Sequence, residues 1–206
     1  MLLWAGLFFV FLGLACLAID RHAVHVIYDK VDARFHNFLN ATTHFAKAAH
    51  WLIAAVTVYA TCWAWLRWGE PNAIAKLALQ CALAFIISLG AGSALLHLTK
   101  LIIGRRRPRD ELEMNLYGFV LFGFDLNMNS FPSGHALTIA CVAVIATALW
   151  PQWAVLWFAV ALWLALTRAL LTAHFLSDVF VGFGVGLISA REVLLNLFPH
   201  LAPVWF

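Results

Sequence analysis

Apolar residues run along this 206-residue chain in six long stretches, and polar residues concentrate in the segments between them. The stretches cover residues 1–19, 48–66, 74–103, 133–149, 153–173 and 176–198. A helix of about 20 apolar residues spans the hydrocarbon core of a bilayer. The pattern therefore predicts an all-α fold, a six-transmembrane-helix bundle, with residues 1–206 forming a single integral-membrane domain. Short turns are expected at 69–72 and 150–153, and a long polar loop at 104–131.

Residues 20–47 depart from this pattern. Apolar side chains recur there at helical spacing, with polar residues between them: Val31, Phe35, Phe38, Leu39 and Phe45. Such spacing is typical of an amphipathic helix lying in the membrane interface. The segment also holds scattered histidines, but they show no compact metal-ligand spacing. We interpret them as solvated interfacial residues.

The composition agrees with a membrane protein. The chain is 64% hydrophobic and 11% charged, with mean hydropathy +0.89, whereas a soluble domain is about 25% charged. The first stretch lacks the basic residues that open a cleaved signal peptide, so we expect a retained span. The net charge of +3 is modest and its basic residues are local, which argues against nucleic acid as a partner. The four cysteines lie in apolar stretches and are expected only to pack.

Three polar clusters occur at the ends of four of the predicted spans. With six crossings, the third span ends on the side where the fourth begins, and the fifth ends and the sixth begins on that side too. The clusters therefore meet at one membrane face. Their residues are Lys100, Arg107, Ser133, Gly134, His135, Arg168, His174 and Asp178.

Lys100 and Arg107 suit phosphate binding, because an arginine can hold two phosphate oxygens and a lysine adds a point charge. They are seven residues apart and would share a face if the helix continued through both, with Pro108 ending it. The neighbouring Arg105, Arg106 and Arg109 are interpreted as a basic patch for lipid headgroups.

Ser133 is placed to cap the helix that follows it. The first backbone N–H groups of a helix are unpaired and favour a bound anion. His135 would lie in the first turn, within reach of such an anion as a proton donor.

Arg168 lies in an apolar stretch, where a charge costs about 2.5–3.5 kcal/mol at the centre of a span. This cost suggests a function, the alternative being a structural ion pair with Asp178. His174 and Asp178 are four residues apart, as neighbours on one helix face would be. A carboxylate there would orient the imidazole for nucleophilic or basic catalysis.

Together these clusters resemble the signature of the phosphatidic acid phosphatase type 2 superfamily. That pattern is Lys-x6-Arg-Pro, then Pro-Ser-Gly-His, then Ser-Arg-x5-His-x3-Asp, and this chain departs from it only at Thr167, where the family usually has serine. The soluble vanadate haloperoxidases share the site, but the hydropathy argues against them.

The resemblance implies a role for each site residue. His174 would attack phosphorus and form a phosphohistidine, Asp178 would orient it, and His135 would protonate the leaving oxygen. The phosphate would be held by the remaining site residues, with neither metal nor cofactor: Lys100, Arg107, Ser133, Gly134 and Arg168.

The leading hypothesis is a lipid phosphatase of the bacterial inner membrane, whose partners are the bilayer and a phosphorylated lipid. Candidate substrates are phosphatidylglycerophosphate, undecaprenyl diphosphate, phosphatidic acid and a lipid A phosphate. The alternative is a non-catalytic phospholipid-binding or lipid-transport protein. Two indications of orientation conflict, and we expect the site on the periplasmic or outer face. Basic residues at the site face, among them Arg21, Arg34 and Lys47, favour the cytoplasm, whereas the resemblance implies the periplasmic or outer side.

Overall fold

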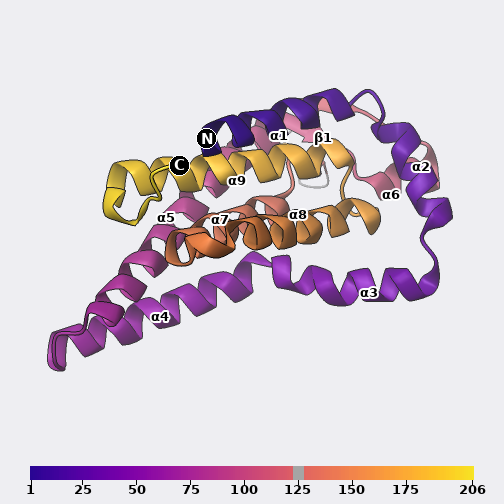
Figure 1. The fold of residues 1–206 in the computed structure, drawn as a ribbon. Helices are drawn as coiled ribbons and strands as arrows, with labels where there is room; N and C mark the ends of the chain where they lie inside the picture. The colour runs from indigo at the N-terminus through magenta and orange to yellow at the C-terminus, as the bar shows by residue number, and fades with distance from the viewer. Residues whose placement is uncertain (123–127) are drawn as a thin grey trace.

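The computed structural model describes residues 1–122 and 128–206, and most of them are helical (Figure 1). The α-helices are α1 Leu2–Cys16, α2 Asp20–Lys30, α3 Ala33–Thr43, α4 Ala48–Trp68, α5 Ala73–Ile102, α6 Pro108–Met114, α7 Gly134–Leu149, α8 Ala154–Leu170 and α9 Leu176–Leu197. Short 3-10 turns occur at η1 His44–Ala46, η2 Pro151–Trp153 and η3 Pro199–Leu201. Strands β1 Ile103–Arg105 and β2 Phe119–Leu121 pair antiparallel, which adds a small ladder to the predicted all-α fold.

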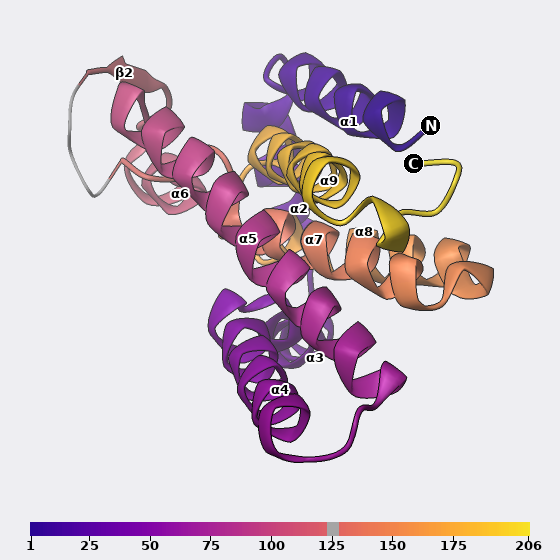
Figure 2. The same ribbon diagram turned by 90° about the vertical axis from the view of Figure 1, so that its left-hand side faces the viewer.

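Helices α7 and α9 form the centre of the bundle. Helix α9 lies between α1 and α7, and α8 packs beside α7 (Figures 1 and 2). Small residues allow α1 and α9 to approach closely, since a Cβ on Gly184 would lie 2.6 Å from the carbonyl oxygen of Gly6. Small residues allow such close helix packing in membrane proteins.

The six predicted spans are not confirmed. Within residues 1–122 and 128–206, three helical segments are long and apolar enough to cross a membrane: Ala33–Trp68, Ala73–Ile102 and Pro151–Leu170. The stretch predicted at 1–19 ends earlier, because α1 stops at Cys16 and the chain bends by 86° into α2. This bent pair is a fourth candidate. The bend carries Asp20 into the interior, where it is 1% exposed.

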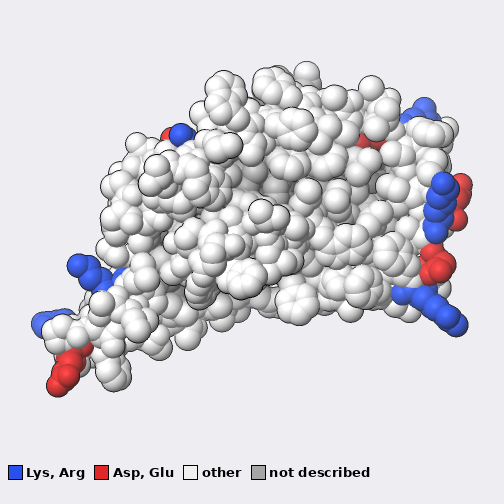
Figure 3. All heavy atoms as spheres, in the orientation of Figure 1, with Lys and Arg blue, Asp and Glu red and all other residues white. Residues whose placement is uncertain are grey.

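Charged side chains gather at the two ends of the face drawn in Figure 3, and a mostly uncharged surface lies between them. One end carries α2, α3 and α6; the other carries the turn between α4 and α5 (Figure 1). This distribution is what a bilayer-embedded bundle requires, because charge is costly within hydrocarbon.

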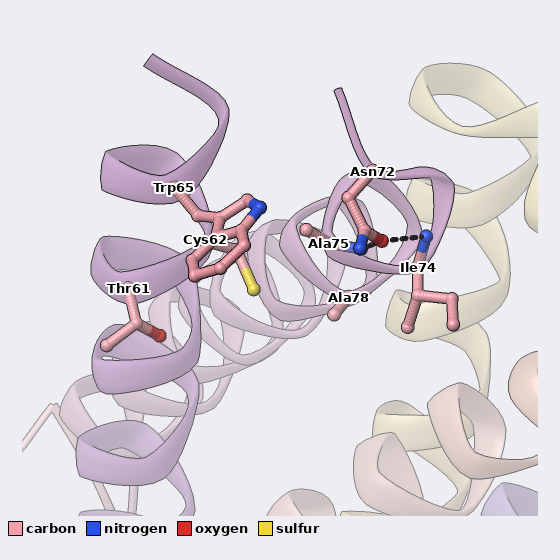
Figure 4. Close-up of a pocket in the computed structure, with 7 residues that line it drawn as sticks. All are labelled: Thr61, Cys62, Trp65, Asn72, Ile74, Ala75 and Ala78. Atoms are coloured by element: carbon pink, nitrogen blue, oxygen red, sulfur yellow. Dashed lines mark hydrogen bonds between the residues drawn. The ribbon is translucent and has the colours of Figure 1, made fainter. Parts of the chain in front are cut away.

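The far end is built by the α4–α5 hairpin. Asn72 caps α5 there, accepting hydrogen bonds from the N–H groups of Ile74 (2.9 Å) and Ala75 (3.0 Å) (Figure 4). The predicted turn at 69–72 is confirmed. A shallow, mainly apolar hollow of about 340 Å³ adjoins it, lined by Thr61, Cys62, Trp65, Asn72, Ile74, Ala75 and Ala78 (Figure 4).

The predicted loop at 104–131 contains β1, α6 and β2, while its residues 123–127 lie outside the described residues. Helix α5 ends at Ile102, so the expectation that Lys100 and Arg107 share a helix face is wrong. Pro108 begins α6 and does not end α5. The first position of a helix suits proline because its N–H group would be unpaired anyway.

Candidate active site

Four elements bring the predicted residues to one end of the bundle. Helix α5 carries Lys100 in its last turn, and α7 carries His135 in its first turn. Helix α8 carries Arg168 in its last turn, and α9 carries Asp178 in its first turn. The turn before α7 touches α9 directly, since the Ser133 N–H donates to the Asp178 carbonyl oxygen at 2.9 Å. Gly182 makes this approach possible, because a Cβ there would lie 2.3 Å from the Ser133 carbonyl oxygen.

His174 and Asp178 face each other, although not on one helix as expected. His174 lies in the turn before α9, and its Nδ1 is 3.5 Å from Asp178 Oδ2. The same carboxylate oxygen accepts hydrogen bonds from the Ser130 hydroxyl (2.6 Å) and the Phe175 N–H (2.9 Å). Burial lowers the pKa of His174, the Asp178 carboxylate raises it, and Arg168 and Arg107 lower it further, so that the pKa lies below its usual value. The ring is therefore neutral near pH 7, and a proton on Nδ1 leaves the Nε2 lone pair available for attack.

Arg105 is not part of a headgroup patch, which corrects the sequence interpretation. Its side chain is 0% exposed and forms ion pairs with Asp178 (2.5 Å) and Asp20 (2.8 Å). Burial alone would lower the pKa of Arg105, but the two carboxylates raise it. The ion pair considered between Arg168 and Asp178 is also wrong, because Arg105 occupies that place.

The remaining cations have neutral partners. Arg107 donates to the side-chain oxygen of Asn129 at 3.1 and 2.7 Å, and Arg168 donates to the Thr43 hydroxyl at 3.2 Å. The salt bridges found among the described residues include neither of these arginines, nor Lys100. Their positive charges remain available for a bound anion.

Thr167, the one departure from the family pattern, is fully buried. Its hydroxyl donates to the Leu164 carbonyl at 2.6 Å and lies within hydrogen-bonding distance of the Thr43 hydroxyl, at 3.0 Å. Thr43 therefore joins the C-terminus of α3 to the Thr167–Arg168 pair. Sequence reasoning missed Thr43, because no local pattern distinguishes it from other polar residues of the amphipathic segment.

Ser133 immediately precedes α7, but its side chain does not cap the helix as predicted. Its hydroxyl is buried and has no hydrogen-bond partner within residues 1–122 and 128–206. A buried hydroxyl without a partner costs free energy unless a ligand satisfies it. A phosphate oxygen at the N-terminus of α7, where Gly134 contributes the first helical N–H, fits this hydroxyl.

His135 lies within electrostatic reach of the other clusters: Arg107, Arg168 and His174 all act on it. Lys47, just before α4, acts on it too, and the sequence indicated only that this lysine lies at the same face. The predicted catalytic and phosphate-binding residues therefore converge, and Lys47, Thr43 and Arg105 join them. Asp20 was missed because its partner Arg105 lies 85 positions away.

Comparison with known proteins agrees with this geometry. A model of the PAP2 superfamily matches residues 77–200, more than half of the chain. A lipid A 1-phosphatase of Rhizobium etli is 35% identical over 104 residues, covering 50% of this chain and 45% of that protein. One of Rhizobium johnstonii is 36% identical over 92 residues, covering 45% and 38%. These matches span less than half the length of either curated relative.

Two solved structures share the fold. The transmembrane PAP2-type phosphatidylglycerolphosphate phosphatase of Bacillus subtilis has a TM-score of 0.63 at 19% identity, covering 100% of this chain and 98% of that one. LpxE of Aquifex aeolicus has a TM-score of 0.59 at 16% identity, covering 86% and 96%. The sequence-level family match extends from α5 to the end of α9 and contains all three motifs. The chain belongs to the PAP2 superfamily.

Proposed function

We propose that this protein is a membrane lipid phosphatase that works through a phosphohistidine on His174. One observation carries the proposal. At one end of the bundle, the described residues include an unpartnered Ser133 hydroxyl, three cations without carboxylate partners and a buried histidine whose Nδ1 lies 3.5 Å from the Asp178 carboxylate. A phosphate group satisfies each of these features at once, because it supplies negative charge and hydrogen-bond acceptors.

In the first step, His174 Nε2 attacks phosphorus and the bond between phosphorus and the lipid oxygen breaks. His135 gives its proton to that oxygen, so the lipid leaves as an alcohol. Water then attacks the phosphohistidine while His135 accepts its proton, and inorganic phosphate is released. Lys100, Arg107 and Arg168 stabilise the charge that builds on the phosphoryl oxygens in both transition states. Asp178 holds the ring and stabilises its positive charge.

The names of the relatives favour particular substrates. Both curated relatives are lipid A 1-phosphatases, and one structural neighbour is a phosphatidylglycerolphosphate phosphatase. We therefore propose a lipid A 1-phosphate first and phosphatidylglycerophosphate second, with phosphatidic acid and undecaprenyl diphosphate as the other arms of a substrate panel.

The lipid chains have two apolar surfaces available. Phe35 and Phe38 stack on the exposed part of α3, with their ring centroids 6.3 Å apart. An apolar groove of about 520 Å³ runs between α4, α5 and α7, from Trp51 to Trp150. Along α7 it begins at Val142, about 10 Å below His135 at 1.5 Å per residue. A phosphate at the site would thus leave its chains at hydrocarbon depth.

Lateral entry predicts a difference between substrates. Replacing Phe35 and Phe38 by serine should lower kcat/KM for a long-chain lipid phosphate severalfold, because binding of the non-reacting chains helps position phosphorus. Turnover of a small chromogenic ester in the same detergent should change little. Equal losses for both substrates would contradict lateral entry.

We further propose six membrane crossings, by α1, α4, α5, α7, α8 and α9, with the site on the periplasmic side of the bacterial inner membrane. The gathering of charge at the two ends supports the crossings, and the family resemblance favours the periplasmic side. A single cysteine replacing Glu113, in a variant without the four native cysteines, should react with a membrane-impermeant thiol reagent on intact spheroplasts. A cysteine replacing Asn72 should react only after lysis. The reverse pattern would place the site in the cytoplasm.

The function itself is tested by phosphate release from the purified protein with the lipid panel in detergent. Wild-type protein should release phosphate in the presence of EDTA, because cationic side chains supply the charge that a metal would bring. Vanadate should inhibit by imitating five-coordinate phosphorus. His174→Ala should be inactive while unfolding at the same temperature. Failure of the wild-type protein to hydrolyse any of the four lipids would leave the non-catalytic lipid-binding alternative.

A further inference from the structure

Three buried charges from three distant segments form one cluster beside the proposed nucleophile. Asp20 is the first residue of α2, Arg105 ends β1, and Asp178 lies in the first turn of α9. All three side chains are 0% exposed. Burying a charge is costly unless it is paired and hydrogen-bonded, so three buried charges in one place require a structural or functional reason.

The two oxygens of Asp178 have different partners. Oδ1 accepts from the Arg105 guanidinium at 2.5 Å, whereas Oδ2 lies 3.5 Å from His174 Nδ1. Arg105 therefore holds the carboxylate from the side opposite His174. This contact fixes the rotation of the carboxylate and turns Oδ2 toward the ring.

Arg105 is itself held from several sides. Its second terminal nitrogen donates to Asp20 Oδ2 at 2.8 Å and to the Tyr117 hydroxyl at 3.0 Å. Its guanidinium carbon lies 4.2 Å from the ring centre of Phe175 and 4.7 Å from that of Phe119. These aromatic faces stabilise the cation and exclude water from it.

Asp20 completes the cluster. One of its oxygens accepts from the Ser177 N–H at 3.1 Å, and the other accepts from the Ser177 hydroxyl and from Arg105. Asp20 therefore joins the start of α2 to the start of α9. Its charge offsets that of Arg105, so the cluster as a whole presents one net negative charge to His174.

We infer that Asp20 and Arg105 are positioning residues of the proposed phosphoryl transfer, Arg105 by orienting the Asp178 carboxylate and Asp20 by cancelling the positive charge that Arg105 brings. The inference rests on the proposed function. Without Asp20, Arg105 would neutralise Asp178, and the phosphorylated imidazolium would lose the negative charge that stabilises it.

The other charges around His174 do not supply this negative charge. The groups acting on it are Asp178 from α9, Arg168 from α8 and Arg107 before α6, and His135 from α7 lies close by. Asp178 is the one acid among these four. The effect of Asp20 must therefore pass through Arg105, which gives it a recognisable signature in the pH dependence.

The test is the acid limb of kcat/KM, which reports the ionisation of the essential base in the free enzyme. Asp20→Asn leaves the cluster with no net charge, because Arg105 then neutralises Asp178; this disfavours the imidazolium and moves the acid limb to lower pH. Arg105→Gln leaves two carboxylates, favours the imidazolium and moves the limb to higher pH. Each displacement should be about half a pH unit or more, with kcat about tenfold lower.

The double variant Asp20→Asn/Arg105→Gln again leaves one net negative charge. Its acid limb should return close to the wild-type position, although kcat stays low because the Asp178 carboxylate has lost its anchor. If Arg105→Gln does not fold, the test rests on two variants: the acid limb should move to lower pH in Asp20→Asn and return in the double variant. Asp29→Asn and Arg109→Gln, exposed residues of the same segments, serve as matched controls and should leave the profile unchanged.

Opposite displacements, with recovery in the double variant, support the inference, because general loosening of the fold has no reason to move the limb in both directions. Limbs that do not move, or that move the same way, would overturn it while wild-type turnover and an inactive His174→Ala leave the proposed function standing. Absence of turnover by the wild-type protein would overturn both.

Discussion

Two sets of basic side chains lie at the same end of this bundle and differ in what balances their charge. Arg105 is fully buried between two carboxylates. Arg107 and Arg168 are half-buried, and their hydrogen bonds go to the neutral side chains of Asn129 and Thr43. The first arginine has its charge satisfied within the protein, whereas the other two retain theirs for a ligand.

This contrast shows why an arginine cannot be assigned from its type or its neighbours in sequence. Arg105 and Arg107 are two positions apart, yet one lies at the end of β1 and the other precedes α6. We propose that Arg105, whose charge is balanced by carboxylates, acts on the protein, and that Arg107 and Arg168, which lack such partners among the described residues, act on the substrate. Replacing each in turn should therefore produce different defects.

The largest difference is expected between Arg168→Met and Arg105→Met. Arg168→Met removes a cation that we propose stabilises the transition state, so turnover should fall about 100-fold or more with little change in the unfolding temperature. Arg105→Met leaves two buried carboxylates without a partner, which costs about 3–5 kcal/mol of the free energy of unfolding. Phosphate release and thermal unfolding in detergent check the two variants side by side. A stable, active Arg105→Met protein would break the comparison.

Gly182→Ala should have the next largest effect, because it disturbs the contact between α9 and the turn before α7. The new methyl group would meet the Ser133 carbonyl oxygen at 2.3 Å, so the turn before α7 must shift. Overpacking of this kind costs about 1–3 kcal/mol, and a small misplacement of the phosphate site lowers turnover by about tenfold or more.

Gly90→Ala is the matched control for that variant. A Cβ on Gly90, also within a helix, meets nothing within 4 Å. Alanine there should keep full turnover and raise the free energy of unfolding by about 0.5–1 kcal/mol, since glycine weakens helix interiors. If both variants lost turnover equally, close approach at Gly182 would not be the cause.

The smallest effect is expected at Thr43, which tests how Arg168 is positioned. Thr43→Val removes the hydroxyl that accepts from Arg168. A hydrogen bond to a charged group contributes about 1.5–3 kcal/mol, so kcat/KM should fall about tenfold through looser positioning of the guanidinium. Thr42→Val, whose hydroxyl bonds only to the backbone of its own helix among the described residues, should be close to wild type. Equal activity of the two variants would show that Arg168 needs no such support.

The long helices could be predicted from the sequence to within a few residues, because sustained apolar stretches depend on no tertiary partner. Helices α4, α7 and α9 begin and end close to the predicted stretches at 48–66, 133–149 and 176–198. The first stretch was predicted too long, since Asp20 is drawn inward by Arg105, and that attraction is invisible in local sequence.

The candidate site divides in the same way. The three motifs converge as the counting of crossings predicted, and the resemblance on which the motifs were interpreted is confirmed by the family match. The partners of Asp178 could not be predicted, because four arginines in five positions present one indistinguishable basic run. Arg105 is fixed by tertiary contacts that the local sequence does not show: it pairs with Phe119 across β1 and β2, and its backbone bonds to Met128 and Ser130.

Trapping the phosphoryl group during turnover tests the central claim most directly. The purified enzyme is mixed with a long-chain lipid phosphate, and the reaction is quenched in alkali, which preserves a phosphohistidine. The modified residue is then identified by mass spectrometry of the digested protein. The account predicts a phosphoryl group on His174 of the wild-type enzyme. It predicts that the His174→Ala variant neither carries a phosphoryl group nor releases phosphate. Phosphate release by His174→Ala at the wild-type rate, or a phosphoryl group mapped to a different residue, would contradict it.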